Sequence, residues 1–286
     1  MIDNLSTLAP GLYLIATPIG AARDITLRAL DLLKSAEVLV AEDTRSLKRL
    51  MDIHGIDPAG RPVLSYHDHN GAKMRPRILE RLRAGQSVLY ASEAGSPLVA
   101  DPGYDLVRDV IEAGLPLSCA PGPSAVIAAL CLSGLPSDRF LFAGFLPAAQ
   151  NRRKTALEEL SDVPATLIFY ESPRRIAALL KDAVGILSGD RKAVLCREMT
   201  KKFEEVLRGT LLELSIQLNE RDLKGELVLL IERGAPQSTT DEEITEALVQ
   251  ALPKMSVRDA ADTVARAYGL KKRDVYQKAL KFSKGD

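Results

Sequence analysis

Apolar and polar residues follow two different rhythms along the first 120 residues. Short runs rich in Val, Leu and Ile are typical of buried strands, and each is followed by a segment whose apolar residues recur every three or four positions, as in a helix. The predicted strands are 12–19, 37–43, 62–67, 87–93 and 116–122, and the predicted helices lie near 26–35, 44–54, 72–84 and 105–113. This alternation predicts an α/β domain with a mostly parallel, doubly wound sheet.

The pattern changes after residue 121. An apolar helix at 124–134 is followed by strands with only two long helices between them, near 174–188 and 211–221. These strands are predicted at 140–145, 165–171, 192–199, 204–209 and 225–232. Consecutive strands without intervening helices favour antiparallel pairing, so this part predicts a mixed sheet.

The last part of the chain has helical periodicity only. A polar linker at 234–243 precedes short helices around 242–251, 257–268 and 272–282. We therefore predict an N-terminal α/β domain at 1–120, a mixed α/β domain at 121–233 and a small basic helical domain at 241–286.

Composition places the chain among soluble globular proteins, with 46% hydrophobic and 27% charged residues. The 38 basic and 38 acidic residues cancel, so a surface for nucleic acid must be local. One such region is the tail, where nine Lys and Arg against four Asp from Lys254 onward give a net charge of +5.

No apolar run is long enough to cross a bilayer, and the first residues lack the basic start of a signal peptide. Three widely separated cysteines, Cys119, Cys131 and Cys196, are predicted to be buried and reduced, which indicates a cytoplasmic protein without a membrane partner.

Loops that combine glycine with proline follow three of the predicted strands. They are Thr17–Gly20, Ser92–Pro97 and Ala120–Ser124. Glycine lets a ligand approach the backbone, and proline makes the loop rigid before binding. Each loop by itself reads equally as a turn, but three at equivalent strand ends predict a binding cleft. Because both phosphate-binding glycine motifs are missing, a nucleoside triphosphate or a dinucleotide is disfavoured.

Charged residues beside these loops are candidates for chemistry. After the strand at 37–43, Asp43 or Thr44 is a candidate cap of the next helix. Alternatively, Glu42, Asp43 and Arg45 lie at the mouth of the cleft as a base and a substrate clamp. His67 and His69 have ligand-like spacing but no further partners nearby, so we expect a polar loop and no metal. The basic cluster at 151–154 follows another strand, where cations oppose the dipole at a helix start; either it is solvated or it binds an anion.

Several ordered motifs resemble the ribosomal RNA small subunit methyltransferase I family over residues 9–233. They are IATPIG (15–20), AEDTR (41–45), EAGSPLVADPGY (93–104), PGPSA (121–125), GLPSDRFLFAGFLP (134–147), FYESPRR (169–175) and KGELVLLIE (224–232). This family comprises the 16S rRNA (cytidine-2′-O)-methyltransferases of the tetrapyrrole methylase superfamily. The resemblance implies two α/β domains of tetrapyrrole-methylase type, S-adenosylmethionine (SAM) bound between them, and a homodimer that acts on 16S rRNA in the small ribosomal subunit.

The resemblance also implies which residues line the SAM site. They are Pro18, Gly20, Ala94, Gly95, Ser96, Pro97, Ser124, Phe169 and Tyr170. The loop at 93–104 would then be a rigid backbone cradle for SAM. The family usually has Asp-Ala-Gly-Thr-Pro where this chain has Glu93 and Ser96; serine keeps the hydroxyl, whereas the longer arm of Glu93 leaves its role open.

For the reaction itself, we expect a carboxylate to accept the ribose hydroxyl proton, and the candidates are Glu42, Asp43 and Glu171. Basic residues are expected to contact RNA phosphates: Arg45, Arg152, Arg153, Lys201, Lys202, Lys271, Lys272 and Arg273. Two alternatives stay open: a methylase of a small tetrapyrrole, for which the basic tail has no evident use, and a non-catalytic module that binds SAM or RNA.

Overall fold

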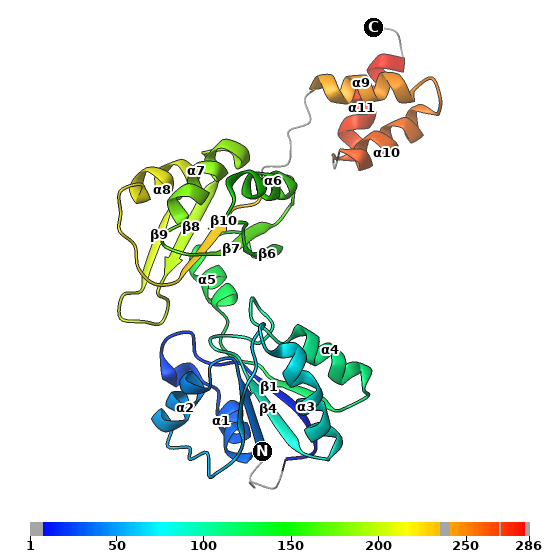
Figure 1. Cartoon of the computed structure of the whole chain (residues 1–286). Helices are drawn as coiled ribbons and strands as arrows, with labels where there is room; N and C mark the ends of the chain where they lie inside the picture. The colour runs from blue at the N-terminus through cyan, green and yellow to red at the C-terminus, as the bar shows by residue number, and fades with distance from the viewer. Residues whose placement is uncertain (1–7, 235–240, 269, 284–286) are drawn as a thin grey trace. The chain divides into compact units, whose positions relative to one another are not determined.

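The computed structural model describes residues 8–234, 241–268 and 270–283. The chain divides into two compact units, Met1–Arg233 and Gly234–Asp286 (Figure 1). In the described residues, the first unit contains two five-stranded sheets, and the second contains three helices. Within the described residues, no helix combines the length and apolar character that crossing a membrane requires.

The first sheet is entirely parallel, with the strand order β3-β2-β4-β1-β5. Its strands are β1 (Gly11–Ile15), β2 (Val38–Ala41), β3 (Val63–Ser65), β4 (Ser87–Ala91) and β5 (Leu117–Ala120). Helices α1 (Leu27–Ser35) and α2 (Thr44–Ile53) pack on one face, and α3 (Gly71–Arg83) and α4 (Tyr104–Glu112) pack on the other. The predicted doubly wound parallel sheet is confirmed.

After the adjacent parallel strands β1 and β4, the chain passes to opposite faces of the sheet. α1, which follows β1, contributes Leu32 and Leu33 to the core on one face, whereas α4, which follows β4, contributes Leu106 and Val110 to the other. Such a point, where neighbouring connections diverge, leaves a crevice at the carboxyl ends of the strands. The fold thus places an opening beside the loops that follow β1 and β4.

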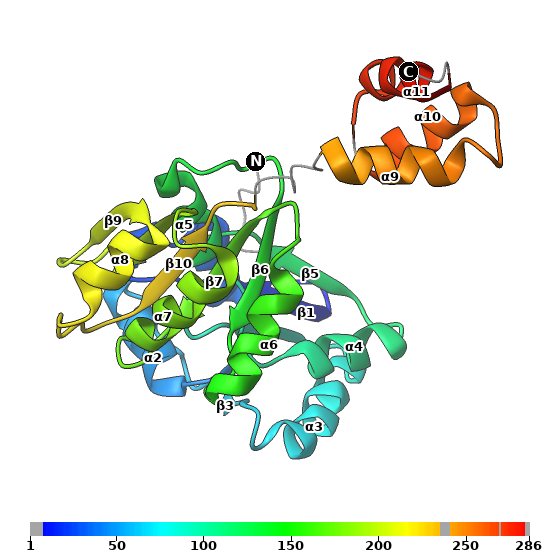
Figure 2. The same ribbon diagram turned by 90° about the horizontal axis from the view of Figure 1, so that it is seen from above.

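The second sheet is mixed, with the order β6-β7-β10-β8-β9, as predicted. Its strands are β6 (Phe140–Phe145), β7 (Thr166–Glu171), β8 (Lys192–Arg197), β9 (Glu205–Thr210) and β10 (Leu227–Ile231). Among the described strands of this sheet, β6 and β7 pair in parallel and the other neighbours pair antiparallel. Helix α5 (Ala125–Ser133) covers one face, and α6 (Gln150–Leu160), α7 (Ile176–Leu187) and α8 (Leu211–Leu218) lie side by side over the other (Figures 1 and 2).

Strand alternation decides which side chains of β7 face which layer. Leu167 and Phe169 pack into the core under α6–α8, whereas Ile168 and Tyr170 join the cluster under α5. This is the two-residue period of a strand buried on both faces.

Helix α6 is not among the long helices that the sequence pattern predicts, so that prediction is incomplete. Its sequence is mostly polar, and it has too few apolar residues to show a helical period. Arg153 on α6 is buried and pairs with Asp182 on α7, with Nη2 2.7 Å from the carboxylate. A buried ion pair thus supports a helix whose amphipathic pattern is weak.

The second unit packs α9 (Asp241–Ala251), α10 (Val257–Ala267) and α11 (Lys272–Ser283) around one small core. Leu248, Val264 and Val275 contribute one side chain from each helix. Ser256 caps α10 by accepting a hydrogen bond from the amide of Asp259.

Two of the three cysteine predictions are wrong. Cys196 is buried on β8, but Cys119 on the edge strand β5 and Cys131 on α5 are exposed. Their apolar neighbours suggested burial, yet both elements present a side that the described residues of the chain leave uncovered.

Candidate active site

The loops after β1 and β4 are joined by backbone pairing. The amide of Thr17 donates to the carbonyl of Gly95 over 3.0 Å, and the amide of Gly95 donates back over 2.9 Å. The hydroxyl of Thr17 lies 3.1 Å from the carbonyl oxygens of both Ser92 and Glu93. Thr17, which sequence reasoning did not single out, therefore ties the two loops into one structure.

The loop after β5 joins them through a side chain. Ser96 donates its hydroxyl to the carbonyl of Pro123 over 3.0 Å. All three glycine-proline loops are therefore brought together at the carboxyl ends of β1, β4 and β5, as the sequence predicted.

Glycine is required at two points of this arrangement. Gly95 has a φ of +85°, and a Cβ there would lie 3.4 Å from Ile19. A Cβ on Gly20 would lie 2.5 Å from both Thr200 and Lys201, which belong to the loop between β8 and β9. Gly20 therefore leaves room for the side chains of Thr200 and Lys201 to lie directly against its backbone.

Two hollows flank the segment 17–26. One is lined by Pro18 and Gly20 of the first loop, Glu93 of the second and part of α2. The other is lined by Ser124, Thr26 and Thr200 among others. Pro18, Gly20 and Ser124, three of the residues predicted to bind SAM, therefore face open space.

The loop from 93 to 103 is held in an unusual conformation. Positive φ angles occur at Leu98 and Ala100 as well as at Gly95 and Gly103. The buried hydroxyl of Tyr90 anchors this loop by donating to Asp101 over 2.7 Å, and burial raises the pKa of that carboxyl. Tyr90 belongs to an apolar strand run, so its anchoring role was not visible in the sequence.

The three carboxylates proposed for catalysis have different surroundings. Burial, followed by the negative charges of Asp101 and Glu93, raises the pKa of Glu42. Hydrogen bonds from Arg45 lower the pKa of Asp43 to about 2. Asp43 also caps α2 by accepting from the amide of Arg45, so the cap interpretation of this residue is confirmed.

Glu171 does not join this group. Its side chain is 0% exposed at the end of β7, where it accepts a hydrogen bond from the amide of Ser172 and pairs with Arg175. A carboxylate without exposed surface does not reach a hydroxyl of a large substrate, which argues against Glu171 as the base.

Phe169 corrects a second expectation. Its ring is fully buried beneath α6–α8, so it does not line a cofactor site. Tyr170 faces the opposite side and packs edge-on against Phe142, with ring centroids 4.7 Å apart. The two residues are neighbours in one motif, but successive side chains of a strand point to opposite faces of the sheet.

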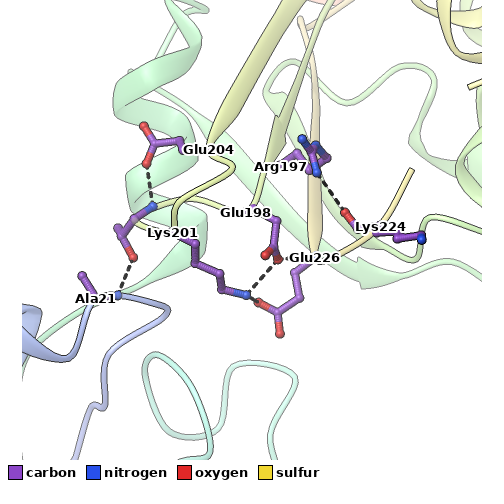
Figure 3. A network of polar contacts seen from close by, with 8 residues as sticks. Ala21, Arg197, Glu198, Lys201, Glu204, Lys224 and Glu226 are labelled. Atoms are coloured by element: carbon purple, nitrogen blue, oxygen red, sulfur yellow. Dashed lines mark hydrogen bonds and ion pairs between the residues drawn. The ribbon is translucent and has the colours of Figure 1, made fainter. Parts of the chain in front are cut away.

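The loop between β8 and β9 reaches the first glycine loop from the second sheet. Thr200 accepts a hydrogen bond from the amide of Ala21 over 3.0 Å. The ammonium of Lys201 lies 2.8 Å from Glu198 and 2.9 Å from Glu226. Both contacts are drawn in Figure 3. Thr200 has no sequence signal beyond its place in a polar hairpin, so its contact was not predictable.

The basic residues predicted to bind RNA differ in availability. Arg45 has a side chain that is 90% exposed, and Arg152 and Lys202 are also exposed. The prediction for Arg153 is wrong, because its guanidinium is buried against Asp182. Lys201 is held by its two carboxylates. In the second unit, Lys271 and Arg273 are exposed, and Lys272 pairs with Asp262 over 2.7 Å.

His67 and His69 lie close together, with ring centroids 6.0 Å apart. Within the described residues, no group of three or more His, Cys, Asp or Glu side chains is arranged to hold a metal ion.

Similarity to known sequences identifies the family of this chain. The profile of the Tetrapyrrole (Corrin/Porphyrin) Methylases matches residues 11–215, and that of the RsmI C-terminal HTH domain matches residues 238–283. Ribosomal RNA small subunit methyltransferase I of Mesorhizobium japonicum is 46% identical, over 96% of this chain and 92% of that protein. The chain belongs to the ribosomal RNA small subunit methyltransferase I family. The protein of the same name from Haemophilus influenzae is 42% identical, over 94% of this chain and 96% of that protein.

Solved structures share the fold at low sequence identity. Diphthine synthase has a TM-score of 0.59 at 17% identity, covering 78% of this chain and 90% of that one. The uroporphyrin-III C-methyltransferase of Thermus thermophilus, complexed with S-adenosyl homocysteine, has a TM-score of 0.54 at 20% identity, covering 77% of this chain and 96% of that one. The fold of two α/β domains of tetrapyrrole-methylase type with a helical tail is thus confirmed.

Proposed function

We propose that this protein methylates the ribose 2′-oxygen of a cytidine in 16S rRNA within the small ribosomal subunit, with SAM as the methyl donor. The observation that carries the proposal is the junction of three glycine-proline loops in a member of a ribosomal RNA methyltransferase family. The rival substrate is a small tetrapyrrole. The helix-turn-helix match in the tail favours a nucleic acid instead.

The cleft suits a cofactor held through backbone groups and hydroxyls. Pro18 and Gly20, which line one hollow, and Ser124, which lines the other, would contact SAM. Residues 94–97 of the adjoining loop and the ring of Tyr170 would complete the site. The carboxylates around Glu42 and Glu93 create a negative field, which favours a cationic ligand. When bound, SAM supplies an electrophilic methyl group on a positively charged sulfur.

Glu42 is the base in this proposal. Its raised pKa makes it a better proton acceptor near neutral pH than Asp43, whose pKa of about 2 reflects a strong preference for the ionised form. Glu42 would accept the 2′-hydroxyl proton as that oxygen takes over the methyl group, and the electrons of the broken carbon–sulfur bond would leave with S-adenosylhomocysteine. The remaining catalysis is positioning of the two reactants.

RNA would be held by exposed cations on both units. Arg45, Arg152 and Lys202 are the candidates on the first unit, and the exposed Lys271 and Arg273 on the tail. Such contacts set affinity and register through phosphates without reading sequence. In this proposal, residues 1–120 and 121–233 are the two catalytic domains, and 241–286 is an RNA-binding domain of a cytoplasmic enzyme.

A homodimer completes the proposal. Helix α5 consists of apolar residues and a terminal serine, yet Ile127 is 47% exposed and Cys131 is exposed. The edge strands β5 and β6 also expose large apolar side chains, Leu117 and Phe145. A helix that is apolar on all sides is typical of a buried element, so a second copy would cover it.

The test uses small ribosomal subunits from a strain that lacks this gene. Purified protein and labelled SAM should methylate these subunits, and mass mapping of the 16S rRNA should place one methyl group on a cytidine ribose. Labelling of a porphyrinogen instead of the subunit would support the tetrapyrrole alternative, and SAM binding without turnover on either would support a non-catalytic module.

A further inference from the structure

The loop between β8 and β9 presents an aromatic ring and a cation together. Phe203 is 62% exposed, and the ammonium of Lys202 lies 5.5 Å from the centroid of its ring. Such exposure leaves a large apolar surface in water in the free unit. The proposed methyl transfer gives Phe203 no role, and it uses Lys202 only as a general phosphate contact.

This pair lies next to the cleft along the chain. Thr200 lines the hollow that contains Ser124 and is bonded to Ala21. Phe203 follows Thr200 by three residues, which span at most about 11 Å even when fully extended. The ring is therefore within reach of a nucleotide that enters the cleft.

The loop is also rigid. The amide of Lys201 donates to Glu198 over 3.0 Å, and the amide of Glu204 donates to Lys201 over 3.1 Å. The carboxylate of Glu204 in turn accepts from the amide of Thr200 (Figure 3). Glu198 and Thr200 both have positive φ angles, 48° and 63°. Backbone strain of this kind persists where the surroundings enforce one conformation, and it often marks a site with a function.

The two lysines of the loop differ in their partners. Lys201 is held by Glu198 and Glu226, and its stem packs against Gly20. Among the ion pairs of the described residues none involves Lys202, whose side chain is exposed beside Phe203. The loop thus uses one lysine to hold its shape and presents the other to solvent.

We propose that Phe203 is a stacking platform for a base of the RNA segment at the cleft, and that Lys202 contacts the adjoining phosphate. This inference rests on the proposed RNA substrate. Single-stranded RNA is commonly recognised by aromatic rings that stack on splayed-out bases, next to cations that follow the backbone. An exposed phenylalanine under a lysine, on a rigid loop beside the cleft, has this chemistry.

The absence of tryptophan from the sequence allows a direct test. In the full-length Phe203→Trp variant the only indole lies at the loop, so its fluorescence reports on that position. Adding an oligocytidylate or undermethylated small subunits should quench it saturably, because the indole stacks on a base. The matched control is Ile216→Trp on α8, at a position that is 70% exposed in the same unit, and its fluorescence should not change.

Kinetics give the second readout. Phe203→Leu keeps apolar bulk but removes the ring, so KM for the subunit should rise about tenfold to hundredfold, with SAM affinity unchanged. Phe203→Tyr should restore the wild-type KM. Lys202→Gln should make the salt dependence of subunit binding shallower by about one phosphate contact.

The outcomes separate this inference from the proposed function. If the wild-type protein methylates subunits and Phe203→Leu has an unchanged KM, with no quenching at position 203, the stacking role is wrong while the proposed function stands. If Phe203→Leu shifts the protein from dimer to monomer by light scattering, the ring is an interface residue and the stacking role is again wrong. If the wild-type protein neither binds nor methylates either RNA, both proposals fail together.

Discussion

Because Gly95 has no side chain, its loop adopts a left-handed φ and pairs directly with the loop that follows β1. The residue pairs with Thr17 through its backbone, has a left-handed φ and lies against Ile19. Ser96 then bonds the next loop. Backbone shape at one residue therefore positions the hydroxyl and amide groups that we propose hold SAM.

Gly95→Val should lower SAM affinity at least about tenfold, because a β-branched residue does not adopt a φ of +85° and the loop must change its backbone conformation. Calorimetry with SAM measures the change. Gly85→Val is the matched control, since Gly85 has a φ of +79° but nothing within 4 Å of its Cβ position. Both variants should lose similar stability, and equal SAM affinities in the two would contradict the assigned site.

Glu42→Gln should lower kcat about a hundredfold or more, with little change in SAM affinity. A base must be ionised, so the wild-type rate should fall as pH drops through the pKa of Glu42, which lies above its ordinary value of 4.5. The variant should lose this acid limb of the pH–rate profile. Asp43→Asn should retain it, because the pKa of Asp43 is about 2; a variant pair with the opposite behaviour would assign the base to Asp43.

At the scale of elements, charge pairing compensates for weak hydrophobic patterning. α6 is polar over most of its length, and its contact with α7 includes a buried pair between Arg153 and Asp182. Gln150 donates a further hydrogen bond to Asp182 over 3.0 Å. Breaking a buried pair leaves one charge without a partner, which is costly.

Asp182→Asn should therefore lower the free energy of unfolding by about 3–5 kcal/mol in urea titrations. The control is Asp138→Asn, which breaks an exposed pair with Arg233 and should cost less than about 1 kcal/mol. Burial opposes ionisation of Asp182, but hydrogen bonds from Gln150 and Arg153 lower its pKa below the ordinary 3.8. Its stabilisation is therefore present above the unfolded-state pKa and is lost as pH falls through the lower folded value. Equal destabilisation of the two variants would contradict this account.

At the scale of the whole molecule, the proposed methyl transfer and part of the proposed RNA binding belong to different compact units. The two compact units meet at Arg233 and Gly234 in sequence, and each has its own core. The first unit holds the cleft, and the second carries the helix-turn-helix match with exposed Lys271 and Arg273.

A protein that ends at Arg233 should bind SAM as the full chain does but bind the small subunit more weakly. The slope of log affinity against log salt should become shallower by about 0.9 for each duplex phosphate that the tail no longer neutralises, or about 0.7 for a single strand. Filter binding at several salt concentrations measures both quantities. Unchanged affinity and slope in the truncated protein would assign the tail a different role.

Ile127→Asp should convert the proposed dimer into a monomer, because a carboxylate on α5 cannot be buried against a second copy without a large desolvation cost. Sedimentation measures the mass. Ile216→Asp on α8, at an apolar position that is even more exposed, should leave the mass unchanged. A wild-type protein that sediments as a monomer would contradict the dimer itself.

The sequence alone determined the elements and their order. Apolar runs and helical spacing predicted both sheets, and glycine with proline at strand ends marked the three loops of the cleft. These features are local, since each depends on residues within one strand, helix or turn. The sequence pattern did not predict helix α6, because this helix depends on an ion pair with a residue distant in sequence.

Only the tertiary structure decided what faces what. Phe169 and Tyr170 are neighbours in one motif, yet the pleat sends Phe169 into the core under α6–α8 and Tyr170 to the other face. Arg152 and Arg153 look alike in sequence, but only Arg153 meets Asp182, 29 residues away. The contact between Thr200 and Ala21 spans 179 residues. Such pairings depend on how the sheets and helices pack, and no local propensity encodes them.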